Sequence, residues 1–99
     1  MYGTVARIRV KPGAEEALMA QFREYSTLRV PGYQRTYAYR MDNNPAEFYL
    51  AIVFDSKESY RANAESPEQD KRYREMVALL DGEPEWHDGE ILVDVVAGG

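Results

Sequence analysis

The chain has 99 residues, of which 44% are hydrophobic and 29% charged, and it contains no cysteine. Its 17 Asp and Glu against 12 Lys and Arg give a formal net charge of −5. The length predicts a single domain over residues 1–99. The acidic balance argues against a nucleic-acid backbone or an anionic membrane surface as partner. Without cysteine there is no disulfide, no thiol nucleophile and no cysteine-ligated metal.

The N-terminal segment does not have the pattern of a signal peptide, because Arg7 and Arg9 interrupt its apolar residues. No stretch approaches the roughly 20 apolar residues of a membrane span. We therefore expect a cytoplasmic protein with no membrane partner.

The first predicted strand, Met1–Val10, has one mostly apolar face, and its other face ends in two arginines. A Lys-Pro-Gly turn follows. Apolar residues then recur at three- and four-residue spacing, which predicts a helix with a core-facing stripe. That stripe is Ala14, Leu18, Phe22 and Tyr25, and Pro31-Gly32 ends the segment.

Two more strands are predicted at Tyr33–Met41 and Glu47–Phe54, joined by a hairpin turn at 42–45. The strand Glu47–Phe54 is apolar on both faces, which is typical of a strand that is covered on both sides. A single layer of helices covers only one face. We expect a second copy of the chain to cover the other, giving a homodimer.

The strand Tyr33–Met41 carries an unusual ribbon of arginine and tyrosine. Alternation puts its odd-numbered residues on one face: Tyr33, Arg35, Tyr37, Tyr39 and Met41. Phenols and guanidinium groups suit a cavity for a planar aromatic or anionic ligand. Tyrosine and arginine are also enriched in dimer interfaces, and the interface is the favoured interpretation. Both interpretations stay open, and they are compatible.

The second helical region is predicted to form two pieces, Ser56–Ala64 and Pro67–Leu80. Asp55 and Glu58 have the spacing of a capping box, and Ser66-Pro67 is a second helix start. The last predicted strand runs from Glu85 to Val96, with a bulge at Asp88-Gly89.

The element order strand–helix–strand–strand–helix–strand predicts an α+β fold, a ferredoxin-like βαββαβ sandwich with an antiparallel sheet. RNA-recognition motifs share this order. They need a basic start to the third strand, and Glu47-Phe48 does not provide it.

His87 is the only histidine. It is a candidate general base beside acidic neighbours, or simply an exposed side chain near a bulge. No motif for a nucleotide, a flavin or a catalytic serine is present, and no carboxylate spacing resembles a calcium loop. We expect no cofactor and no metal.

Four segments carry a resemblance to a known family: Val5–Gly13, Asn44–Phe48, Phe54–Tyr60 and Ser66-Pro67. On these residues the chain resembles the antibiotic biosynthesis monooxygenase family of the dimeric α+β barrel superfamily. The resemblance implies two sheets that close into a barrel across a two-fold axis. It also implies a pocket in each subunit between sheet and helices. Some members oxidise phenols, anthrones or quinols with O2 and no cofactor.

The resemblance implies Tyr60, Arg74 and Asn63 as catalytic residues. Together with strand alternation it implies the substrate-binding residues Leu50, Ile52, Phe54, Phe22 and Met76. The chain differs from the oxygenases at Leu50, where asparagine is expected, and at Phe54, where tryptophan is usual. Many relatives also have a histidine where Asn63 stands.

Haem-degrading relatives use an asparagine, a tryptophan and a histidine, and this chain has Ala6, Asn63 and Tyr73 near those positions. Haem degradation is therefore not expected. The leading hypothesis is a cofactor-independent monooxygenase acting on a small aromatic substrate. The alternative is a non-catalytic ligand-binding or structural dimer of the same fold.

Overall fold

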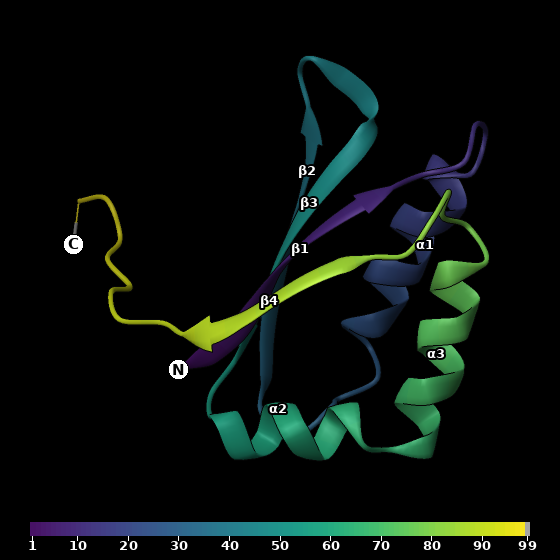
Figure 1. Cartoon of the computed structure of the whole chain (residues 1–99). Helices are drawn as coiled ribbons and strands as arrows, with labels where there is room; N and C mark the ends of the chain where they lie inside the picture. The colour runs from purple at the N-terminus through teal and green to yellow at the C-terminus, as the bar shows by residue number, and fades with distance from the viewer. Residues whose placement is uncertain (99) are drawn as a thin grey trace.

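A computed structural model describes residues 1–98, which form one antiparallel sheet with its helices on one face (Figure 1). The strands are β1 (Tyr2–Arg9), β2 (Tyr33–Met41), β3 (Asn44–Phe54) and β4 (Glu85–Glu90). The helices are α1 (Glu15–Tyr25), α2 (Lys57–Ala64) and α3 (Pro67–Val77). The predicted ferredoxin-like α+β fold is confirmed, with its second helical region divided as expected. None of the helices in residues 1–98 has the length and hydropathy needed to cross a membrane.

The strand order is β2-β3-β1-β4, so β3 and β1 are central and β2 and β4 are edges. Side chains that face the helices on the central strands form the core with the buried faces of α1 and α3. The fully buried members are Ala6, Ile8, Leu18, Phe48, Leu50 and Phe54. Burial of this apolar surface fixes the helices to one side of the sheet.

Local sequence explains where α2 and α3 begin. The Ser66 side chain accepts a hydrogen bond from the Gln69 N–H at 3.1 Å, and proline follows it at the first helical position, as predicted. The predicted cap of α2 at Asp55 is wrong. Ser56 caps this helix, because its extended backbone places its hydroxyl where the Ser59 N–H donates at 3.1 Å. The Asp55 carboxylate instead accepts from the Ser59 hydroxyl at 2.6 Å.

The last strand is shorter than predicted. It ends at Glu90 rather than Val96, because β1 begins at Tyr2 and offers no partner beyond the Met1 carbonyl, which accepts from the Ile91 N–H. The predicted bulge at Asp88-Gly89 is also wrong. The β1–β4 pairing runs without interruption from Tyr2 opposite Glu90 to Arg7 opposite Glu85.

Two other boundaries differ from the prediction. α3 ends at Val77 instead of Leu80, because Leu80 pairs with Val10 in an isolated bridge that draws the chain out of the helix. β3 begins at Asn44, within the predicted hairpin turn.

An irregularity in β2 corrects the predicted faces of that strand. The register shifts between Tyr33 and Arg35, so Tyr33 lies opposite Phe54 on the helix side. There its ring packs edge-on against Tyr25 at 4.7 Å and against Phe54 at 5.6 Å. Arg35, Tyr37 and Tyr39 keep the predicted alternation, opposite Val53, Ala51 and Tyr49 on the other face.

The sheet face away from the helices is uncovered within residues 1–98. It carries exposed apolar side chains, including Val5 at 49% and Tyr37 and Tyr39 at 53% each. The segment after β4 leaves the body of the molecule (Figure 1), and its side chains Leu92, Val93, Val95 and Val96 are at least 73% exposed. A large apolar surface of this kind marks an interaction site.

Gly3 gives a test of the central pairing. A Cβ at this position would lie 2.0 Å from the Ile52 carbonyl oxygen, whereas a Cβ at Gly89, its partner across the β1–β4 pair, would meet nothing within 4 Å. Gly3→Ala should lower the free energy of unfolding by about 1–3 kcal/mol. Gly89→Ala is the matched control and should change it by less than about 1 kcal/mol. Urea denaturation of both variants measures this, and equal stabilities would contradict it.

Candidate functional site

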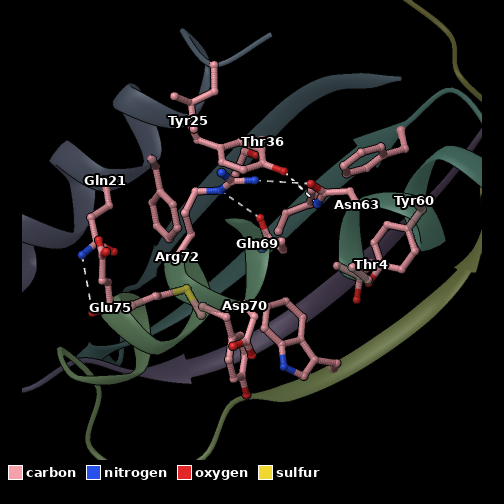
Figure 2. Close-up of a pocket in the computed structure, with 18 of the residues that line it drawn as sticks. Thr4, Gln21, Tyr25, Thr36, Tyr60, Asn63, Gln69, Asp70, Arg72 and Glu75 are labelled. Atoms are coloured by element: carbon pink, nitrogen blue, oxygen red, sulfur yellow. Dashed lines mark hydrogen bonds between the residues drawn. The ribbon is translucent and has the colours of Figure 1, made fainter. Parts of the chain in front are cut away.

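A cavity of about 490 Å³ lies between the helix-facing side of the sheet and the three helices (Figure 2). Its floor is apolar, formed by Ile52 and Phe54 from β3 and Trp86 from β4, and Phe22 and Met76 close it from α1 and α3. The volume and the apolar walls suit a small, flat organic ligand.

One polar group in the cavity is built around Arg72 (Figure 2). Its Nε donates to Gln69 Oε1 at 3.1 Å, and an Nη donates to Asn63 Oδ1 at 3.5 Å. Asn63 in turn donates to the Tyr25 hydroxyl at 2.9 Å, and the guanidinium lies 5.2 Å from the centre of the Tyr25 ring. All these partners are neutral, and none of the ion pairs found in residues 1–98 involves Arg72. Arg72 is therefore a half-buried cation that lines the cavity and forms no ion pair with a carboxylate of the described residues.

A second polar group joins α2 to the edge strand β4. The Tyr60 hydroxyl donates to Asp88 Oδ1 at 2.9 Å. Its ring packs against Phe54 at 5.4 Å and Tyr2 at 5.3 Å. Burial, and then the hydrogen bond to the Asp88 carboxylate, raise the pKa of Tyr60 above its ordinary value. Tyr60 is thus a protonated donor at neutral pH and is not itself a base.

Most of the site residues implied by the sequence resemblance line this cavity. They are Tyr60, Asn63, Phe22, Ile52, Phe54 and Met76. Leu50 does not, because it is fully buried in the core between Ala6 and Ala38 of the neighbouring strands.

Arg74 lies outside the cavity. Its side chain is 71% exposed and pairs with Asp70 at 3.1 Å. Because consecutive helix residues are about 100° apart, Arg74 is rotated by roughly 200° from Arg72. Of the two arginines, Arg72 is the one that lines the cavity, on the same side of α3 as Met76, which is one turn away.

Sequence reasoning missed Arg72, Tyr25, Thr4 and Asp88, which also line the cavity. A signal for Arg72 existed, since it precedes Met76, one of the implied substrate-binding residues, by four residues on the same helix. Asp88 lies two residues after Trp86 and therefore points to the same face of β4. The bulge predicted at Asp88-Gly89 would have changed this alternation, so the sequence did not indicate the shared face.

His87 points to the opposite face of β4, because it alternates with Trp86 and Asp88. Its Nε2 lies 2.9 Å from Glu85 Oε1, and its side chain is 62% exposed. It does not line the cavity. Over residues 1–98 no group of three His, Asp or Glu side chains is arranged to hold a metal ion.

An antiparallel sheet with helices on one face and a cavity between them defines an α+β protein with an internal cavity. The sequence model of the antibiotic biosynthesis monooxygenase family matches residues 1–79. The chain belongs to this family. No curated protein matches its sequence.

Solved structures share the fold at low sequence identity. A candidate antibiotic biosynthesis monooxygenase from Chloroflexus aurantiacus is 24% identical with a TM-score of 0.77, and the match covers 98% of both chains. A candidate from Nitrosomonas europaea is 18% identical with a TM-score of 0.75, covering 92% of this chain and 89% of the other. A variant of SnoaB, a cofactor-independent oxygenase from Streptomyces nogalater, is 17% identical with a TM-score of 0.76, covering 99% and 97%.

The buried tyrosines predict a loss of stability in alkali. Burial is also the main cause that raises the pKa of Tyr25. Above about pH 10 the unfolded chain releases phenol protons that the native state retains, so the free energy of unfolding falls as pH rises. Below that pH this contribution is fully present. Urea denaturation between pH 8 and 11 should show a shallower decline for Tyr60→Phe than for the wild type, and identical slopes would contradict the assignment.

Proposed function

We propose that this protein is a cofactor-independent monooxygenase that oxidises a small aromatic substrate, such as a phenol, quinol or anthrone, with O2. Membership of the monooxygenase family supports this proposal. The observation that carries it is an apolar cavity of about 490 Å³ that contains a protonated phenol donor, Tyr60, and a cation without a carboxylate partner, Arg72.

Such a reaction needs no cofactor when the substrate supplies the electrons. Removal of a proton from an anthrone gives an enolate, whose carbon transfers electrons to O2 and bonds to it as a peroxide. Loss of water then leaves a carbonyl, so one oxygen atom enters the product and the other enters water. The protein must hold the substrate away from bulk water and stabilise the anion.

In this proposal Tyr60 donates a hydrogen bond to the developing oxyanion, and Asn63 positions Arg72, whose charge stabilises the anion across the cavity. The geometry favours Arg72 for this role over Arg74, the arginine that the sequence resemblance implied. Ile52, Phe54, Phe22 and Met76 supply apolar contact with the ring. A non-catalytic ligand-binding dimer is the alternative, because the same cavity would bind an aromatic ligand without turnover.

Arg72→Ala and Arg74→Ala form a matched pair of variants on one helix. O2 uptake with anthrone and hydroquinone should fall on the order of a hundredfold for Arg72→Ala and stay near the wild-type rate for Arg74→Ala. Tyr60→Phe should also lose activity by about that factor. Equal rates in all variants would remove these side chains from the mechanism. A wild type that binds phenols but consumes no O2 would favour the ligand-binding alternative.

We also propose that the protein is a homodimer that joins the uncovered sheet faces of two chains. The exposed side chains of Val5, Tyr37 and Tyr39 and the apolar segment after β4 support this. Arg35 and Arg7 on the same face supply the polar rim that such interfaces usually have. In this arrangement Arg35, Tyr37 and Tyr39 of the arginine–tyrosine ribbon belong to the interface and not to the cavity.

Sedimentation at micromolar concentration should give twice the chain mass of 11.4 kDa. A charge placed in the apolar face, Val5→Glu, should shift the protein toward the monomer, because burying an unpaired charge is costly. Arg61→Glu, at an exposed position on α2, is the control and should leave the dimer intact. A wild type that sediments as a monomer would refute the proposed interface.

A further inference from the structure

Thr4 is the buried polar side chain of the core whose hydroxyl has no partner. The residue is 4% exposed, and its Oγ1 makes no hydrogen bond within residues 1–98. A buried hydroxyl without a partner destabilises the folded state, because it has lost its hydrogen bonds to water without replacing them. Thr4 also lines the cavity. An oxygen atom of a ligand in the cavity could therefore form the hydrogen bond that the Thr4 hydroxyl lacks.

The pairing of the strands places Thr4 beside other polar atoms. Thr4 lies directly opposite Asp88 in the β1–β4 register, so the two side chains leave the same face of the sheet. Tyr60 reaches over from α2 to the Asp88 carboxylate (Figure 2 shows Thr4 beside Tyr60). The Thr4 hydroxyl lies near the Tyr60 hydroxyl and opposes the rise in the pKa of Tyr60 as a weak donor, but the contact does not have the geometry of a full hydrogen bond.

The donors and acceptors at this point are complementary to one ligand group. The Tyr60 hydroxyl donates a hydrogen bond to Asp88 Oδ1, which leaves Asp88 Oδ2 with no protein partner among the described residues. The Thr4 hydroxyl can donate or accept. A ligand hydroxyl can therefore donate to the free carboxylate oxygen and accept from Thr4 at the same time.

We infer that Thr4, Tyr60 and Asp88 form a subsite for the acidic hydroxyl of an aromatic substrate, with Asp88 as the general base that takes its proton. This deepens the proposed function and rests on it for the reaction. Asp88 and the rest of β4 lie beyond residues 1–79, the part that matches the family model. The base is thus supplied by a segment that the family match does not include.

The step is a proton transfer. The O–H bond of the substrate breaks, its electron pair stays on the substrate oxygen, and a new O–H bond forms on Asp88. A carboxylic acid is intrinsically a stronger acid than a phenol, so proton transfer from an unoxidised phenol to a carboxylate is unfavourable. The transfer becomes favourable as the substrate loses electrons to O2. The Thr4 hydroxyl then donates a hydrogen bond to the negatively charged substrate oxygen. Once Asp88 is protonated, its hydrogen bond with Tyr60 is weaker, so the Tyr60 hydroxyl can also donate to the substrate oxygen.

Other charged groups near Asp88 are few. Tyr60 contacts Asp88 from α2. On β1, Tyr2 is the next residue on the same face as Thr4, and the Lys57 ammonium lies 5.8 Å from the centre of the Tyr2 ring. Glu90 follows on the same face of β4 and does not line the cavity. Glu90→Gln is therefore a matched control that removes a carboxylate from the same strand.

Oxygen uptake tests the base. Asp88→Asn keeps an acceptor for Tyr60 but should lower kcat on the order of a hundredfold or more at neutral pH. Its rate should recover as the pH rises and the substrate ionises in solution. Glu90→Gln should match the wild type. Equal kcat values and pH profiles for Asp88→Asn and the wild type would overturn the assignment even if the enzyme is a monooxygenase.

Binding of 4-nitrophenol tests the subsite without turnover, because its anion absorbs visible light. Asp88→Asn should lower the pH at which the bound phenol ionises, since a like charge is removed. Thr4→Val should raise that pH and weaken binding by about two- to tenfold. Thr4→Val should also increase the Tm of the free protein, because it removes a buried hydroxyl that has no partner. Loss of a hydroxyl that stabilises the fold through a hydrogen bond would instead lower the Tm. Unchanged ionisation and affinity in both variants would refute the subsite, whether or not the wild type consumes O2.

Discussion

The position of β1 between β3 and β4 is the constraint on which the rest of the structure depends. Its register brings Thr4 opposite Ile52 on one side and Asp88 on the other. A slip of one residue would turn every side chain of β1 to the other face, exposing Ala6 and Ile8 and removing Thr4 from the cavity. The close approach of Gly3 to the Ile52 carbonyl belongs to the same register. Core and site are therefore specified together.

The fold could be predicted from the sequence because its signals are local and redundant. The apolar stripe of α1, the Ser66-Pro67 start of α3 and the alternation of β3 each identify one element without reference to the others. The predicted element boundaries were wrong where a neighbouring strand determines how far an element extends. The apolar run at 91–96 has the composition of a strand, yet the pairing stops once the Ile91 N–H has reached the Met1 carbonyl, because β1 offers nothing further.

The candidate site was predicted less completely than the fold, for a physical reason. Sequence periodicity shows which face of an element is apolar, and together with the family resemblance it brought four apolar side chains around one space: Phe22, Ile52, Phe54 and Met76. A polar side chain at the border of such a face can point either way. Arg72 and Arg74 look equivalent in the sequence, and only the packing of α3 on the sheet separates the half-buried one from the exposed one.

β4 has a distinctive place in this arrangement. It is short, it pairs along one edge only, and it contributes Trp86 and Asp88 to the cavity from outside the segment that matches the family. Trp86 is the residue of this strand that packs against the core, which is built mainly from β1, β3 and the helices. A substitution at Trp86 or Asp88 would therefore change the wall of the cavity while leaving the pairing of the central strands intact.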